Sequence, residues 1–175
     1  SYNYILDMGI SPENIIIAGD SAGGGLSLAL TLYLKDHDMP LPAAVITMSA
    51  WTDLTKSGSS YDDNYETDPL FGNTRESLVY SEDYYKNTTP DNPYVSPKFG
   101  DFTGFPPVLM QVGEMEMLLS DTTDVAKKME DTGVKVKSHI YPGMFHVFQL
   151  GLNLFPEEKE AWNEIEEYIN EIWDI

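Results

Sequence analysis

The chain has 175 residues, no cysteine and a net charge of −19, and 42% of its residues are hydrophobic. This length suffices for one domain with a sizeable core, and the acidic balance argues against nucleic acid and anionic membrane surfaces as partners, because both need a basic face. Disulfides and thiolate metal sites are excluded, and no apolar run is long enough to predict a membrane-spanning helix.

The first strand is expected at residues 15–19, after a short helix near the N-terminus and a turn at residues 11–14. The run Ile15-Ile16-Ile17-Ala18 is hydrophobic on both faces, as is typical of a parallel strand. A helix is predicted over residues 22–36. Leucine at every second position from 26 to 34 also fits a strand, but leucine and alanine favour a helix, and this preference decides the prediction.

Between this strand and this helix lies the sequence Gly19-Asp20-Ser21-Ala22-Gly23. A strand, Gly-x-Ser-x-Gly and a helix, in this order, are the context of a nucleophile elbow. The turn strains the serine and brings the backbone close to itself, so we expect only very small residues to fit at Gly19 and Gly23. The hydroxyl of Ser21 then points out at the carboxyl end of the strand. The amide of Ala22 lies at a helix N-terminus, which favours a developing oxyanion.

The turn has two alternative interpretations. The first is a glycine-rich turn without chemistry. The second is a phosphate-binding loop, which lacks the lysine of a P-loop and has Ser21 where a dinucleotide motif needs its second glycine. The correct strand and helix on either side favour the elbow.

A second strand is predicted at residues 44–48, and residues 55–105 follow with no strong sheet signal and one expected helix near 74–86. This stretch is rich in Tyr, Asp, Asn, Ser and Pro. We expect it to form a packed cap or lid over the site, with a mobile surface excursion as the alternative. The chain therefore divides into a core with the elbow (1–54), a cap insertion (55–105) and a core with the acid and histidine loops (106–175).

The last third of the chain is predicted to hold strands at 108–113 and 134–141 and helices at 119–132 and 156–173. Strands that alternate with helices indicate an α/β fold, here a parallel sheet of about four strands with helices on both faces. In such sheets functional sites lie at the carboxyl ends of the strands.

A serine, acidic residues and a histidine reach this edge in the chain order expected of a hydrolase with a serine nucleophile. His146 lies in a glycine-containing loop after the fourth strand and is the candidate base. The other two histidines are expected to be structural or solvated. Because the three are not at metal-ligand spacing, we expect no metal, and nothing in the sequence calls for a cofactor.

The acid is one of Glu114, Glu116 and Asp121, which all lie in the loop after the third strand. Glu116 is favoured, because the acid should come just past the strand and before the helix begins. Asp121 is expected to cap that helix instead.

Four spaced motifs resemble the hormone-sensitive-lipase-like group of α/β-hydrolase esterases, and the likeness runs along nearly the whole chain. The motifs are Gly19-Asp20-Ser21-Ala22-Gly23-Gly24, Asp68-Pro69-Leu70, Val112-Gly113-Glu114-Met115-Glu116-Met117-Leu118-Leu119 and Tyr141-Pro142-Gly143-Met144-Phe145-His146-Val147-Phe148. The resemblance implies hydrolysis of small esters with short, acetyl-type acyl chains through an acyl-enzyme. It implies these roles for residues of this chain: nucleophile Ser21, acid Glu116, base His146 and oxyanion amide Ala22.

The His-Gly-Gly motif of that family, which supplies further oxyanion amides upstream of the nucleophile, does not occur in these 175 residues. We therefore expect the C-terminal portion of a larger esterase, with the elbow strand as an exposed sheet edge and with the N-terminal portion or a second copy as partner. The start at Ser1 leaves targeting unassigned, and the lack of cysteine and of a signal peptide favours the cytoplasm. The alternatives are a non-catalytic binding or assembly module, and a serine peptidase or thioesterase.

Overall fold

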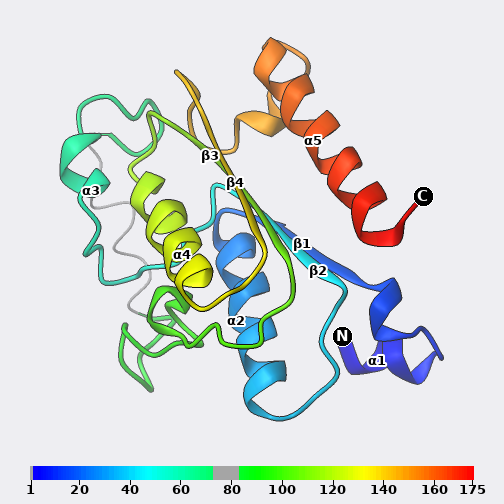
Figure 1. Cartoon of the computed structure of the whole chain (residues 1–175). Helices are drawn as coiled ribbons and strands as arrows, with labels where there is room; N and C mark the ends of the chain where they lie inside the picture. Colours follow the sequence, from blue (N-terminus) through cyan, green and yellow to red (C-terminus); the bar gives the residue numbers. More distant parts are fainter. Residues whose placement is uncertain (1, 73–82) are drawn as a thin grey trace.

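A parallel sheet of four strands lies at the centre of the protein, in a computed structural model that describes residues 2–72 and 83–175 (Figure 1). The strands follow one another in chain order across the sheet, and all three pairings are parallel. They are β1 (Ile16–Asp20), β2 (Ala44–Met48), β3 (Val108–Gly113) and β4 (Val136–Tyr141). The expected α/β fold is confirmed, with β2 and β3 at the predicted bounds and β1 and β4 shifted by one or two residues.

Helices cover both faces of this sheet (Figure 1). One cluster of buried side chains joins two helices to one face, with Leu28, Met110 and Met129 among its members. A second cluster, which includes Ile46 and Ile165, joins the C-terminal helix to the other face. The helices are α1 (Tyr2–Asp7), α2 (Ala22–Asp36), α3 (Ser60–Asp63), α4 (Leu119–Asp131) and α5 (Pro156–Trp173), and α2 and α4 share a face opposite α5.

The alternating leucines at positions 26–34 lie in α2, as the leucine and alanine content predicts. β2 and β3 are buried along their whole length, because strands flank them on both sides and helices cover both faces. In the described part of the chain, β1 pairs with β2 alone and is only partly buried. The elbow strand is therefore the edge strand that the sequence predicts.

The segment between β2 and β3 holds short elements within its described residues. These are α3, a 3₁₀ turn at Pro97–Phe99 and a series of other turns. The helix expected near 74–86 falls mostly outside the described residues, and residues 83–86 form turns. Tyr61 of α3 is buried against Met117 and Leu118, just before α4. The segment thus packs on the loop that carries the candidate acids, while its role as a cap stays a prediction.

In the described residues, no helix combines the length and the apolar character that crossing a bilayer requires.

Candidate active site

Ser21 occupies the single residue between the end of β1 and the start of α2. Its φ of 52° and ψ of −123° are a strained combination for a residue with a side chain. The backbone around it is held by the neighbouring strand: the amide of Ser21 donates to the carbonyl of Met48 at 2.9 Å, and its carbonyl accepts from the amide of Trp51 at 2.9 Å. The local geometry is that of the strand–turn–helix elbow which the sequence predicts.

The glycines of this turn differ in what surrounds them. A Cβ on Gly19 would lie 2.3 Å from the carbonyl oxygen of Gly23, and one on Gly25 would lie 2.0 Å from that of Trp51. Apart from its chain neighbours and the backbone of its own helix, a Cβ on Gly23 would meet no atom of the described residues within 4 Å. The expectation that Gly23 must be small is therefore wrong for this structure: its carbonyl crowds Gly19, but its own missing side chain would point into open space.

His146 lies between Ser21 and Glu116. Its Nε2 is 2.8 Å from Oγ of Ser21, and its Nδ1 is 2.9 Å from Oε2 of Glu116. The side chains of His146 and Glu116 are 7% and 0% exposed. Since a carboxylate can only accept, Nδ1 carries the proton and donates to Glu116, which leaves Nε2 to accept from the serine hydroxyl. The three residues that the sequence picks out therefore form one hydrogen-bonded chain.

The second oxygen of Glu116 is also fully engaged. Oε1 accepts the amide of Gly113 at 2.6 Å and the hydroxyl of Ser49 at 2.7 Å. These donors compensate the burial of the carboxylate, and they fix which of its oxygens faces His146.

The other two acids considered from the sequence are bound elsewhere. Glu114 is on the surface, where it accepts the amide of Gly143 at 2.9 Å. Asp121 is fully buried and accepts the amides of Thr52 and Asp53 at 2.7 and 2.9 Å, so it ties α4 to the loop after β2. The prediction that Asp121 caps the helix is wrong, because its side chain bonds to a loop distant in sequence. Burial raises the pKa of Asp121 to about 8, and the adjacent charge of Asp53 acts in the same direction.

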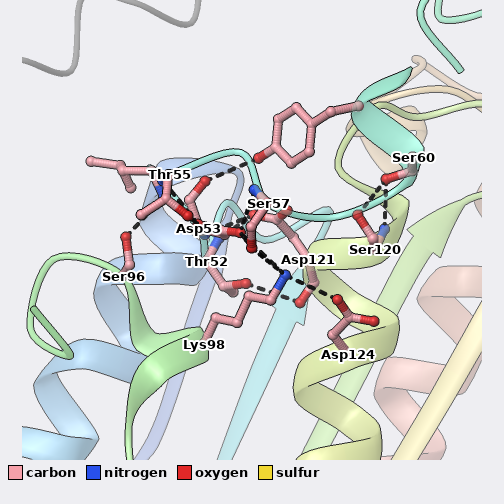
Figure 2. A network of polar contacts seen from close by, with 12 residues as sticks. Thr52, Asp53, Thr55, Ser57, Ser60, Ser96, Lys98, Ser120, Asp121 and Asp124 are labelled. Atoms are coloured by element: carbon pink, nitrogen blue, oxygen red, sulfur yellow. Dashed lines mark hydrogen bonds and ion pairs between the residues drawn. The ribbon is translucent and has the colours of Figure 1, made fainter. Parts of the chain in front are cut away.

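Asp121 belongs to a network of polar residues beside the site, where Lys98 reaches in from the 3₁₀ turn (Figure 2). Its Nζ lies 3.1 Å from Oδ2 of Asp53 and 2.9 Å from Oδ2 of Asp124. Burial disfavours the charge of Asp53, but hydrogen bonds from Ser57, Thr55 and Lys98 outweigh it and hold the pKa of Asp53 below its usual value. The network fixes the loop after β2 against α4. In the described residues, no group of three or more acids and histidines is arranged to hold a metal ion.

The ring of His146 also has an aromatic neighbour, which the sequence does not predict. The ring of Phe71 packs edge-on against the imidazole, with 4.7 Å between centroids. Asp68 holds this turn, because its carboxylate accepts the amides of Leu70, Phe71 and Met117 at 2.8, 3.0 and 2.8 Å. The motif Asp68-Pro69-Leu70 was the sequence signal for this turn. Through Asp68 it connects the residues beside His146 to Met117 in the loop that carries the candidate acids.

An apolar cavity of about 410 Å³ opens beside the elbow. Its wall begins at Ala22, the residue after the candidate nucleophile, and includes Leu26 of α2, Trp51 and Leu54 after β2, and Tyr94. The cavity thus adjoins the turn that holds Ser21, on the side of Ala22 and Gly23.

The parallel sheet, the serine elbow and the serine–histidine–glutamate chain define an α/β protein with the arrangement of a serine hydrolase. The model of the alpha/beta hydrolase fold family matches residues 2–150, and the chain belongs to this family. Among its relatives are an "Esterase" of Acinetobacter venetianus, 40% identical over 169 residues (95% of this chain and 55% of the relative), and an "Acetyl-hydrolase" of Streptomyces hygroscopicus, 36% identical over 161 residues (92% and 54%).

Solved structures of esterases also superimpose on this chain. An esterase/lipase from an uncultured bacterium superimposes with a TM-score of 0.93 at 34% identity, covering 99% of this chain and 58% of that one. An esterase of the bacterial hormone-sensitive lipase family has a TM-score of 0.92 at 34% identity, covering 97% and 57%. The resemblance read from the motifs is confirmed, and the chain spans about half the length of the curated relatives it matches.

Proposed function

We propose that this chain carries the catalytic residues of a carboxylic ester hydrolase that acts on small esters with short acyl chains. One observation carries the proposal: His146 bridges Ser21 and Glu116 with 2.8 and 2.9 Å hydrogen bonds. The names of the relatives, an esterase and an acetyl-hydrolase, support the same reaction and the same acyl class.

In the proposed reaction, Oγ of Ser21 attacks the ester carbonyl while Nε2 of His146 takes the hydroxyl proton. Glu116 accepts from Nδ1 throughout and stabilises the imidazolium that forms. The amide of Ala22, in the first turn of α2 where helix amides have no partner within the helix, donates to the developing oxyanion. The imidazolium then protonates the departing alcohol, which leaves an acyl group on Ser21.

Deacylation repeats these steps with water. His146 removes a proton from a water molecule, the hydroxide attacks the acyl carbon, and the proton returns to Oγ of Ser21 as the carboxylic acid leaves. The cavity lined by Leu26 and Trp51 receives one of the two groups flanking the ester. Residues 55–105 act in this proposal as a cap, which is supported by the packing of Phe71 against His146.

We expect the 175 residues alone to turn over slowly. They contain no His-Gly-Gly sequence, and loss of a single oxyanion donor costs on the order of 10²–10³ in rate. The partner of the site in this proposal is the upstream portion of such an esterase.

The test combines turnover with covalent labelling. Hydrolysis of p-nitrophenyl acetate is measured for the wild type and for Ser21→Ala, and a fluorophosphonate adduct is sought by peptide mass spectrometry. We expect the adduct on Ser21 and a loss of hydrolysis in the variant. Equal hydrolysis by both proteins, together with no adduct, would favour the non-catalytic binding module.

A further inference from the structure

We propose that Ser49 is a positioning residue, whose buried hydroxyl fastens the acid loop and the histidine loop to each other. Ser49 is the first residue after β2 and is 0% exposed. The inference rests on the proposed function, since it assigns a role in the same site to a residue whose hydroxyl bonds to Glu116 and Val147 rather than to Ser21.

The hydroxyl of Ser49 makes one bond to each loop. It donates to Oε1 of Glu116 at 2.7 Å and accepts from the amide of Val147 at 3.0 Å. Glu116 uses its other oxygen to hold His146, which immediately precedes Val147. One hydroxyl therefore bonds both to the acid and to the backbone next to the base.

Two residues of this arrangement, Ser49 and Val147, have strained backbone conformations, which need contacts with other residues to hold them. Val147 has a φ of 53°, which is unfavourable for a β-branched residue, and Ser49 has a φ of 51°. Such conformations cost about 1–3 kcal/mol each and persist only when surrounding contacts enforce them. For Val147 the hydroxyl of Ser49 is such a contact, and the amide of Ser49 is itself held by the carbonyl of Gln111 at 2.7 Å.

The position of Ser49 also predicts which step depends on it. The hydroxyl contacts Glu116 through the oxygen that does not face His146, and Ser49 does not line the cavity. Its loss should leave substrate binding unchanged and should lower the fraction of time in which Glu116, His146 and Ser21 are aligned.

The experiment compares Ser49→Ala and Ser49→Gly with Thr47→Val. Ser49→Gly removes the hydroxyl and relieves the positive φ, so it controls for misfolding of the alanine variant. Thr47 lies two residues earlier on β2, is equally buried, and has a hydroxyl with no partner among the described residues, so Thr47→Val removes a comparable group outside the site.

Three quantities are measured: the rate of fluorophosphonate labelling of Ser21, kcat and KM for p-nitrophenyl acetate, and the low-field NMR line of the His146 Nδ1 proton, assigned by its absence in His146→Gln. Hydrogen bonds to a charged group predict a fall of about 10-fold to 100-fold in labelling rate and kcat for both Ser49 variants, with KM within about twofold. The NMR line should broaden or vanish in both Ser49 variants and persist in Thr47→Val.

The outcomes separate this inference from the proposed function. Labelling of both Ser49 variants at the Thr47→Val rate, with the NMR line retained, overturns the role of Ser49 and leaves the proposed function intact. If the wild type gives no adduct on Ser21, the proposed function fails. In that case the NMR line alone tests the positioning role of Ser49. Loss of the line in the Ser49 variants would support this role, and its persistence would refute it.

Discussion

Replacing Lys98 by methionine tests how much the buried ion pair beside the site stabilises the fold. Methionine keeps most of the apolar stem and removes the charge that faces Asp53, whose side chain is 0% exposed. Removing one partner of a buried pair costs about 3–5 kcal/mol, because a charge is left without its counterion. Asp53 keeps hydrogen bonds from Thr55 and Ser57, which places the expected cost of Lys98→Met near the lower end, at about 3 kcal/mol.

Urea denaturation followed by circular dichroism measures this cost. With a slope of about 2 kcal/mol/M, a loss of about 3 kcal/mol lowers the midpoint by about 1.5 M. Lys127→Met is the matched control: Lys127 is 73% exposed and pairs with Asp131 at 3.0 Å on the surface of α4. An exposed pair contributes little, so we expect the control to lie within about 0.5 kcal/mol of the wild type.

Two results would contradict the reasoning. One is a loss below about 1 kcal/mol for Lys98→Met, which would mean that the remaining hydrogen bonds suffice for the buried carboxylate. The other is an equal loss in the two lysine variants, which would point to net charge rather than burial as the cause.

Two further predictions concern pH and the elbow. The pKa of Asp121 is raised to about 8 in the folded state, so between about pH 4 and pH 8 the unfolded state releases a proton that the folded state keeps. The free energy of unfolding therefore falls as pH rises through this range. The urea midpoints at pH 5 and pH 8 should differ less in Asp121→Asn, which lacks this proton, than in the wild type. Equal differences in both proteins would refute the assignment. Gly19→Ala should cost about 3 kcal/mol, because its Cβ meets a backbone carbonyl, whereas Gly23→Ala should be neutral or stabilising by up to about 1 kcal/mol in thermal melts. Similar losses in both would contradict this difference.

The sheet was predictable because β1, β2 and β3 are short, mainly apolar runs bounded by turn residues, while β4 mixes apolar and polar residues. β2 (Ala44–Met48) and β3 (Val108–Gly113) are buried on both faces, and each contains one polar side chain, Thr47 and Gln111. The chemistry-bearing residues Ser21, Glu116 and His146 were predictable because the carboxyl ends of parallel strands meet at one edge. Their chain order and spacing therefore sufficed to place them together, although their roles remain a proposal.

The supporting contacts could not be predicted, because they depend on backbone conformations that the residue types do not favour. Nothing in the identity of Val147 predicts a positive φ. Ser49 lies 67 residues from Glu116 and 98 from Val147, so its bonds to them become visible only once three loops are placed. The same applies to Asp121, which looks like a helix cap in the sequence and instead bonds to a distant loop.

The incorrect expectation for Gly23 has a different cause. Gly19 and Gly23 lie two residues before and two residues after Ser21, and the Gly-x-Ser-x-Gly pattern predicts the same need for a small residue at both positions. The turn is asymmetric, however: the strand residue Gly19 faces the backbone of the helix, while the helix residue Gly23 faces outward. The two glycines differ only in the direction of their missing side chains, which the sequence does not give.

The bond between His146 and Ser21 joins residues 125 positions apart, which has a consequence for biosynthesis. A ribosome adding about 5–20 residues per second needs about 6–25 s between the two. Throughout that interval the nascent polypeptide displays its serine without a base to activate it. If the proposed function holds, Ser21 can become reactive only after the segment that holds His146 has been synthesised and has docked.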